Sequence, residues 1–409
     1  MLKLSSTEKE IRAAIKISGS KSESNRLLIL KALFADLELK NLSDSDDTFV
    51  LEQALSSTEK TIDIGHAGTA MRFLTAYFAF QKGEKILTGS KRMQERPIKI
   101  LVEALQSLGA DIEYLNKEGF PPLKIRGIEK PITNKVSLRA NISSQYISAL
   151  ILMAASFPKG LEIILEGEIL SRPYIKMTLD LLKEIGIQNT FVSNKISISP
   201  FTSVSKKIVN IESDWSSASY FYSLAALAER AEIELTNFKK NSLQGDSIGS
   251  EIFKQFGVQT VFKNNQTLLI QKNKHNKIPE KIELDLSHYP DIAQTLAVTC
   301  LGLGISFKFS GLSTLRIKET DRLEALKKEL SKFGMRVYIK NDTLAGEAVS
   351  AMVSGIEIET YQDHRMAMAF APLALKTDLI IRNPEVVSKS FPSFWKTLEK
   401  CGIDLKTNT

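Results

Sequence analysis

The amino-acid sequence predicts an α/β protein of two domains, and three observations lead to this expectation. The chain has 409 residues, enough for two or three domains with a large buried core. Four segments, which begin at residues 86, 163, 241 and 309, share one plan: a β-like stretch, a glycine, a helix, a second glycine and another β-like stretch. A new strand-turn-helix pattern opens near residue 212 and divides these repeats into halves.

The helices of these segments are predicted from their apolar periodicity and from their ends. Apolar residues recur at i, i+3 and i+4, as over residues 100–108. Four glycines stand where helix C-caps are expected, because glycine readily adopts the left-handed conformation that ends many helices. They are Gly109, Gly186, Gly257 and Gly334.

Basic residues decorate several predicted helix starts. Arg96 and Arg172 each precede a proline, which suits the first helical position, and Lys318 and Arg322 flank another helix start. A helix N-terminus presents unpaired N–H groups and the positive end of the helix dipole. If the repeats bring these starts to one cleft, that cleft suits a multiply anionic ligand. The alternative is a structural repeat whose charges only cap helices.

The stretch at residues 17–34 has the same character. A helix is predicted to begin near Ser22 to Ser24 and to continue through the apolar run that follows. Lys21 and Arg26 beside this helix start suit a phosphate or a carboxylate. The alternative is a serine-capped helix with two solvated basic residues.

Two further helix starts are candidates for ligand binding. Gly68 lies in a turn where backbone N–H groups can approach an anion closely. Ser143, Ser144 and Gln145 precede an apolar helix, and capping alone explains only one of them. Ordinary helix starts are the alternative at both places.

Charged residues in the second half are candidates for acid–base chemistry. Lys318, Glu319 and Arg322 form either a surface ion-pair series or an anion site with a carboxylate whose pKa the cations tune. Asp291 follows a proline, and Arg365 precedes an apolar helix. For these two helix starts, the alternative is simple capping.

Composition excludes several other classes of protein. Hydrophobic residues make up 43%, charged residues 25%, and the net charge is +7, as in an ordinary globular protein. No block of Lys and Arg predicts nucleic-acid binding. Two cysteines without CxxC spacing indicate a reducing compartment, and four histidines show no metal-ligand spacing. The N-terminus has no apolar signal core and the apolar run at 147–157 is too short to span a membrane, so a cytoplasmic protein is expected.

Taken in order, the motifs resemble those of the 5-enolpyruvylshikimate-3-phosphate (EPSP) synthases, a family of enolpyruvyl transferases. The matching stretches extend from residue 19 to residue 392. They read GSKSESNR, AGTAMR, LTGSKRMQERPI, SSQ, SRPY, SSASYF, QGD, PD, RIKETDRL, DHRMAMAF and KSFP.

The resemblance implies the two-domain enolpyruvyl transferase fold. Each domain is expected to hold three βαβαββ units around buried helices, with the active site in the cleft between the domains. One domain would combine residues 1–19 with 213–409, and the other would span 20–212. The resemblance also implies a monomer that acts on small molecules, without a metal, an organic cofactor, a nucleic acid or a membrane as partner.

The implied reaction transfers the enolpyruvyl group of phosphoenolpyruvate to the 5-hydroxyl of shikimate 3-phosphate and releases phosphate, in aromatic amino-acid biosynthesis. By similarity, shikimate 3-phosphate is held by Lys21, Ser22, Arg26, Ser143, Ser144, Ser171, Asp291 and Lys318. Phosphoenolpyruvate is held by Lys21, Gly68, Arg96, Gln145, Arg322, Arg365 and Lys389. Asp291 is the implied base at the hydroxyl, Glu319 the implied proton donor, and Lys21 is also placed to carry protons.

Some features depart from the family pattern. His66 stands where most members have asparagine, Phe73 replaces a common proline, and Thr314 stands where some members have asparagine. The stretch at residues 47–64 is shorter than in many members, which predicts one trimmed repeat. Gly68 is retained, and this favours sensitivity to glyphosate, because a side chain there would crowd phosphoenolpyruvate.

Two alternatives remain open. UDP-N-acetylglucosamine enolpyruvyl transferases typically carry a reactive cysteine or aspartate on a mobile loop, in the repeat that here reads LTGSKRMQERPI, and no cysteine lies near it. An inert anion-binding protein on the same scaffold is opposed by the intact Lys21, Asp291, Glu319 and Arg322.

Overall fold

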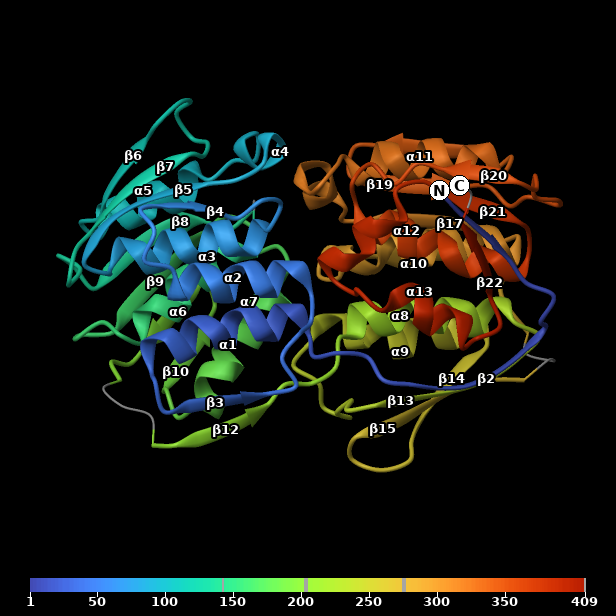
Figure 1. The fold of residues 1–409 in the computed structure, drawn as a ribbon, viewed down its shortest axis with the longest axis horizontal. Coiled ribbons are helices and arrows are strands. Elements are labelled where there is room, and N and C mark those ends of the chain that lie inside the picture. Colours follow the sequence, from blue (N-terminus) through green and yellow to red (C-terminus); the bar gives the residue numbers. More distant parts are fainter. Residues whose placement is uncertain (142, 202–204, 274–276, 408–409) are drawn as a thin grey trace. The chain divides into compact units, whose positions relative to one another are not determined.

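A computed structural model describes the chain except for residues 142, 202–204, 274–276 and 408–409 (Figure 1). The chain divides into two compact units. The discontinuous unit consists of Met1–Ser18 and Glu212–Thr409, and the continuous unit is Gly19–Ile211. Both divisions lie one residue before the positions expected from the sequence.

The described part of the discontinuous unit contains three repeats, each with the order strand, helix, strand, helix, strand, strand. The first consists of β2 (Glu10–Ile15), α8 (Trp215–Leu227), β13 (Arg230–Thr236), α9 (Gly249–Ile252), β14 (Val258–Phe262) and β15 (Thr267–Lys272). The second consists of β16 (Lys281–Asp285), α10 (Ala293–Leu303), β17 (Ser306–Ser310), α11 (Arg322–Lys332), β18 (Val337–Lys340) and β19 (Thr343–Gly346). The third consists of β20 (Ile356–Ile358), α12 (His364–Phe370), β21 (Leu379–Ile381), α13 (Phe394–Glu399), β22 (Asp404–Thr407) and β1 (Leu2–Ser5).

Strands from the N-terminus complete two of these sheets. β2 pairs in parallel with β13, with Glu10 opposite Arg230, and forms one edge of the order β14-β15-β13-β2. β1 lies between β21 and β22 and is antiparallel to both, with Leu2 opposite Thr407. The first eighteen residues are thus part of a unit whose other residues begin at Glu212.

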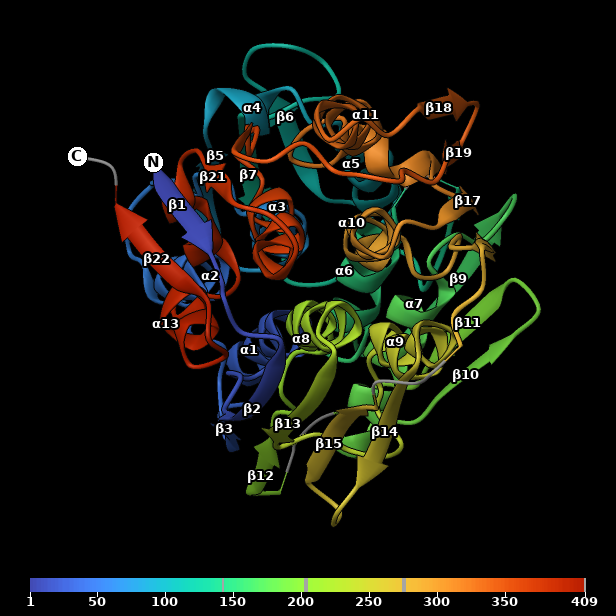
Figure 2. The ribbon, with the colours of Figure 1, turned by 90° about the vertical axis from the view of Figure 1, so that its right-hand side faces the viewer.

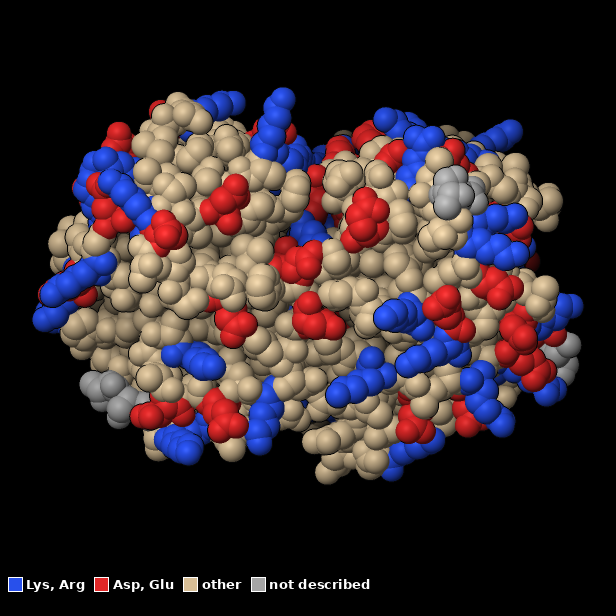
Figure 3. Space-filling model, viewed as in Figure 1, with Lys and Arg blue, Asp and Glu red and all other residues tan. Residues whose placement is uncertain are grey.

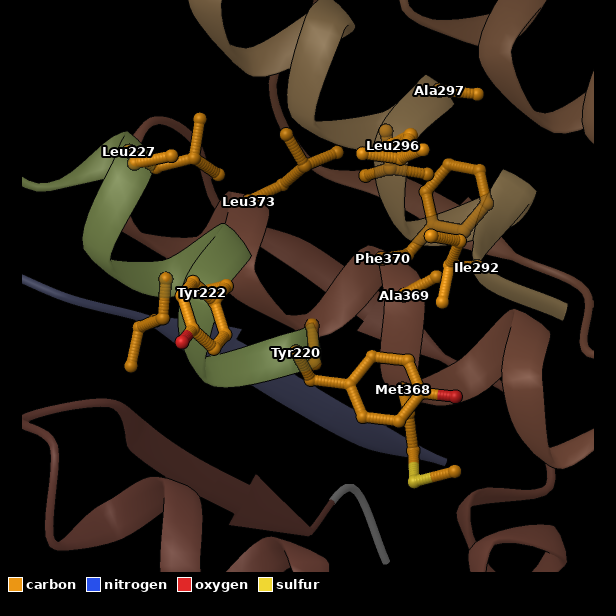
Figure 4. Packing of buried hydrophobic residues seen from close by; sticks show 14 of the residues in the cluster. Tyr220, Tyr222, Leu227, Ile292, Leu296, Ala297, Met368, Ala369, Phe370 and Leu373 are labelled. Carbon is orange, nitrogen blue, oxygen red and sulfur yellow. The ribbon is translucent and has the colours of Figure 1, made fainter. Parts of the chain in front are cut away.

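Buried helices form the core of the discontinuous unit. α8, α10 and α12 are apolar around most of their circumference, which is typical of a helix enclosed on all sides. Figure 2 shows α8 and α10 inside the three sheets of this unit. In Figure 4, Tyr222 of α8, Leu296 of α10 and Phe370 of α12 contribute to this core.

Two complete repeats are found in the described part of the continuous unit. One consists of β4 (Thr61–Asp63), α3 (Gly68–Ala79), β5 (Gly83–Thr88), α4 (Lys91–Gln94), α5 (Lys99–Ser107), β6 (Asp111–Tyr114) and β7 (Leu123–Gly127). The other consists of β8 (Lys135–Arg139), α6 (Ser144–Ala154), β9 (Leu161–Glu166), α7 (Arg172–Glu184), β10 (Asn189–Val192) and β11 (Lys195–Ile198). Their sheet orders, β4-β5-β7-β6 and β10-β11-β9-β8, have the same plan.

The third repeat of this unit is shortened. It consists of β12 (Lys207–Asn210), α1 (Lys21–Leu33), β3 (Leu37–Lys40) and α2 (Asp46–Ser56). Within the described residues its sheet has only two strands, β12 and β3, and α2 leads through residues 57–60 directly into β4. This is the trimmed repeat predicted from the short stretch at residues 47–64.

Local features confirm the predicted helix ends and correct some helix starts. Gly109, Gly186, Gly257 and Gly334 all have positive φ, between 79° and 101°. α1 begins at Lys21, one residue earlier than predicted, because the Ser20 hydroxyl accepts from the Glu23 N–H and caps the helix. Pro97 is not the first helical residue as predicted, since α5 begins at Lys99.

No helix in the described part of the chain is long and apolar enough to cross a membrane. Among these residues, no group of three or more His, Cys, Asp and Glu side chains is arranged to hold a metal ion. On the face shown in Figure 3, Lys and Arg side chains are interspersed with Asp and Glu.

Candidate active site

Arg26 brings three helix starts of the continuous unit together. Its Nε donates to Thr178 Oγ1 of α7 at 2.7 Å, and its Nη2 donates to Ser148 Oγ of α6 at 3.2 Å. Its Nη1 donates to the Ser22 carbonyl at 2.8 Å. Because each residue lies near the second turn of its helix, α1, α6 and α7 begin at the same end of the unit.

Arg26 is buried, and the three hydrogen-bond acceptors of its guanidinium are neutral oxygen atoms. Burial lowers the pKa of Arg26 to about 10, although the nearby Tyr174 and Glu23 oppose this shift. A buried cation whose hydrogen-bond acceptors are uncharged is stabilised by an anion that binds beside it. The alternative of a solvated Arg26 is therefore wrong.

Lys21 is also held in place. Its Nζ lies 3.1 Å from Oδ2 of Asp47, a buried residue of α2. This ion pair fixes the ammonium group at the start of α1. Sequence analysis does not predict a role for Asp47, because it lies in an unremarkable acidic stretch.

Gly68 and Arg96 are in close contact. A Cβ atom on Gly68 would lie 2.4 Å from Arg96 Nη1, so only glycine lets the guanidinium lie against the start of α3. Among the described residues, Arg96 Nε is buried without a hydrogen-bond partner. Gln145 Nε2 donates to Thr69 Oγ1 at 3.2 Å, which joins the start of α6 to the start of α3.

Two residues missed by the sequence analysis support the Arg96 segment. Arg72 Nη2 donates to the Pro97 carbonyl at 2.9 Å, and Tyr146 Oη donates to the same carbonyl at 2.6 Å. Both residues are buried. The only sequence signal was their position within the first five residues of helices with candidate N-termini.

Serine and histidine side chains lie at further helix starts of the continuous unit. Ser171 is the N-cap residue of α7 with φ of 51°, and no capping hydrogen bond of its side chain is found in the described structure. Ser143 Oγ accepts from the Gln145 N–H at 3.3 Å, and Ser144 begins α6. His66 is exposed and its Nδ1 lies 3.0 Å from Ser90 Oγ.

In the discontinuous unit, the candidate residues surround Arg322 at the start of α11. This arginine is fully buried and contacts three carboxylates. Its Nε donates to Asp363 Oδ2 at 2.7 Å, its Nη1 to Asp291 Oδ1 at 3.2 Å and its Nη2 to Glu319 Oε2 at 3.0 Å. The alternative of a surface ion-pair series is therefore wrong for Arg322.

Further cations contact the same carboxylates. Lys389 Nζ lies 3.0 Å from Glu319 Oε1. Asp291 is contacted by Lys318 Nζ at 3.5 Å and by Arg365 Nη2 at 3.3 Å. All of these side chains are at most about a quarter exposed, so solvent screens their interactions only weakly.

The charges of this cluster shift its pKa values. Burial alone would raise the pKa of Asp291, but Arg365, Lys318 and Arg322 outweigh it and hold that pKa well below its usual range. Burial alone would lower the pKa of Arg322, but Asp363, Glu319 and Asp291 raise it above its usual value.

Asp246 is an additional buried carboxyl beside this cluster. It accepts a hydrogen bond from Ser216 Oγ, and Arg365 Nη2 donates to the same hydroxyl at 3.3 Å. Burial and the neighbouring Asp291 raise the pKa of Asp246 to about 6. The QGD motif contained this residue, but nothing in the sequence indicated its burial.

The predicted site residues are divided between the two units. The continuous unit holds Lys21, Ser22, Arg26, Gly68, Arg96, Ser143, Ser144, Gln145 and Ser171. The discontinuous unit holds Asp291, Lys318, Glu319, Arg322, Arg365 and Lys389. Thr314 also lies there, and its hydroxyl is buried without a hydrogen-bond partner among the described residues.

Solved structures of enolpyruvyl transferases have this fold. EPSP synthase from Acinetobacter baumannii matches with a TM-score of 0.78 and 21% identity over 99% of each chain. An enolpyruvyl transferase from Streptomyces tendae matches with a TM-score of 0.74 and 14% identity over 100% of this chain and 98% of its own. The molecule thus has the enolpyruvyl transferase fold.

Sequence comparison identifies the family within this class. The family described as EPSP synthase (3-phosphoshikimate 1-carboxyvinyltransferase) matches residues 38–398. A 3-phosphoshikimate 1-carboxyvinyltransferase of Bacteroides fragilis is 46% identical over 98% of each chain. One of Buchnera aphidicola is 37% identical over 94% of each chain. The chain belongs to the EPSP synthase family.

Proposed function

We propose that this chain transfers the enolpyruvyl group of phosphoenolpyruvate to the 5-hydroxyl of shikimate 3-phosphate and releases phosphate. The observation that carries the proposal is the cluster in which Arg322 contacts both Asp291 and Glu319, in a member of the EPSP synthase family. A base and an acid tied to one buried cation suit a reaction that moves two protons.

The cations suit substrates that carry phosphate and carboxylate groups. Arg96, Arg322 and Arg365 present planar guanidinium forks that match both groups. Arg26 and the starts of α1, α6 and α7 suit the phosphate and carboxylate of shikimate 3-phosphate. Lys21 serves both substrates in this proposal.

The proposed chemistry is an addition followed by an elimination. Asp291 takes the proton of the 5-hydroxyl, and the hydroxyl oxygen bonds to the phosphate-bearing carbon of phosphoenolpyruvate. Glu319 delivers a proton to the methylene carbon. The tetrahedral intermediate then returns a methyl proton to Glu319, which restores the double bond, and the phosphate leaves with the proton that Asp291 had taken. In the chain without substrate, nearby cations lower the pKa of Asp291. A bound anionic substrate partly neutralises these cations, so binding raises the pKa and makes Asp291 a stronger base.

Phosphate release from the purified chain tests this proposal. We expect release from phosphoenolpyruvate only when shikimate 3-phosphate is present, and not with UDP-N-acetylglucosamine as acceptor. Lys21→Ala is expected to lower the rate at least about a hundredfold, because it removes a cation from both substrates. No release from a folded chain, or release with the nucleotide sugar instead, would contradict the proposal.

A further inference from the structure

A turn of two left-handed residues leads into the helix that carries Arg365. Tyr361 and Gln362 have φ of 53° and 56°, and the Asp363 N–H donates to the Thr360 carbonyl at 2.9 Å. Positive φ at both central positions is the mark of a type I′ turn, which usually contains asparagine and glycine. Tyrosine and glutamine disfavour this conformation, so the turn depends on support from its surroundings.

Glu329 of α11 supplies that support on one side of the turn. Tyr361 Oη donates to Glu329 Oε1 at 2.6 Å, and Glu329 is fully buried. Its Oε2 accepts from the Glu359 N–H at 3.1 Å and from Lys332 Nζ at 2.6 Å. Glu329 therefore holds Glu359, just before the turn, and Tyr361, the first of its two left-handed residues.

Arg322 holds the other side of the turn. Asp363 accepts from Arg322 Nε at 2.7 Å, and it caps α12 by accepting from the Arg365 N–H at 2.9 Å. Arg322 and Glu329 belong to the same helix, α11, so the turn is attached to this helix at both ends. The conformation of the turn thus fixes Asp363 relative to α11 and fixes where α12 begins.

We propose that Tyr361, held by Glu329, is a positioning residue that directs the guanidinium groups of Arg322 and Arg365 toward phosphoenolpyruvate. This inference rests on the proposed function. Tyr361 acts through the turn and not by contact with the substrate. Without its hydroxyl the turn relaxes, and binding must reorder the two guanidinium groups, while Lys318 still holds Asp291 and Lys389 still holds Glu319.

Steady-state kinetics of Tyr361→Phe test the inference. We expect the KM for phosphoenolpyruvate to rise about fivefold, as for the loss of one supporting hydrogen bond, with kcat and the KM for shikimate 3-phosphate within about twofold of the parent. Adding Gln362→Gly is expected to restore the KM, because glycine adopts positive φ without strain.

Tyr338→Phe is the matched control. Tyr338 Oη also donates to a glutamate, Glu347 Oε1 at 3.1 Å, but Tyr338 lies on β18 and is 51% exposed. Its loss is expected to leave all kinetic constants unchanged. If Tyr361→Phe does not fold, Glu329→Gln replaces it, with the same rise in KM expected.

The outcomes separate the inference from the proposed function. Phosphate release that requires shikimate 3-phosphate, together with an unchanged KM for phosphoenolpyruvate in the folded Tyr361 or Glu329 variant, overturns the inference alone. A rise in KM that Gln362→Gly does not reverse also overturns it. A parent chain without phosphate release overturns both.

Discussion

The contact between Gly68 and Arg96 shows how the absence of a side chain can shape a site. The guanidinium occupies the space that a Cβ atom would need, so the start of α3 and the Arg96 cation reach the same place. The backbone N–H groups and the cation can then bind one anion together.

Gly68→Ala is therefore expected to displace Arg96 and to raise the KM for phosphoenolpyruvate about tenfold. Gly249→Ala is the control, because a Cβ there meets no atom of the described residues within 4 Å. Kinetics of both variants check the prediction. Equal constants for Gly68→Ala and the parent would show that Arg96 does not need this space.

Asp246 is expected to affect stability through pH. Its pKa is raised from 3.8 to about 6 by burial, so the unfolded chain loses this proton at lower pH than the folded chain. The stabilising effect of the raised pKa is complete below about pH 4 and is lost as the pH rises through about 6.

Asp246→Asn removes the free-energy cost of holding an ionised carboxylate at this buried position. It is expected to raise the free energy of unfolding by up to about 3 kcal/mol above pH 6 and to change it little below pH 4. Denaturant unfolding at several pH values checks this, with the exposed Asp404→Asn as control. A gain that is the same at all pH values would rule out titration of Asp246 as its cause.

For single residues, the sequence predicted which side chains are candidates for the site but not that they are buried. Arg26 and Arg322 were candidates because they stand beside helix starts. Arginine side chains are usually exposed, however, so the sequence was equally compatible with two solvent-exposed side chains. Their burial depends on residues far away in the chain, such as Thr178 for Arg26 and Asp363 for Arg322. The supporting roles of Asp47 and Tyr146 depend on such distant contacts as well.

Among the elements, helix ends were predicted better than helix starts. A C-cap glycine is a local requirement of the backbone, so Gly334 and its counterparts were found from the sequence alone. The first residues of α1 and α5 differed from prediction by one or two positions, because several neighbouring serines and prolines can begin a helix. The shortened repeat was predicted from chain length.

Gly334→Ala tests how much the glycine after α11 stabilises the end of this helix, and it changes no candidate site residue. Gly334 has φ of 91°, and a Cβ there meets nothing within 4 Å among the described residues, so only backbone strain opposes the change. We expect the free energy of unfolding to fall by about 1 kcal/mol with kinetic constants unchanged. Denaturant unfolding and phosphate release measure the two effects, and a change in KM would contradict the separation.

For the whole molecule, the continuous unit is predicted to fold alone. Gly19–Ile211 is unbroken in sequence, and its buried helix α6 lies entirely within it. This fragment is expected to unfold cooperatively on heating and to release no phosphate, because Asp291 and Glu319 lie in the other unit. Circular dichroism checks the first expectation, and a fragment without a cooperative transition would contradict it.

The pairing of β1 with β22 sets the order in which the protein can assemble on the ribosome. β1 is made roughly 400 residues before its partner Asp404–Thr407. At about 5–20 residues per second, β1 waits roughly 20–80 s for that partner. The continuous unit can fold during this time, while β1 remains an unpaired strand that attracts other chains. Insertion of β1 between β21 and β22 is thus a late step, and chaperones that bind extended segments have long access to β1.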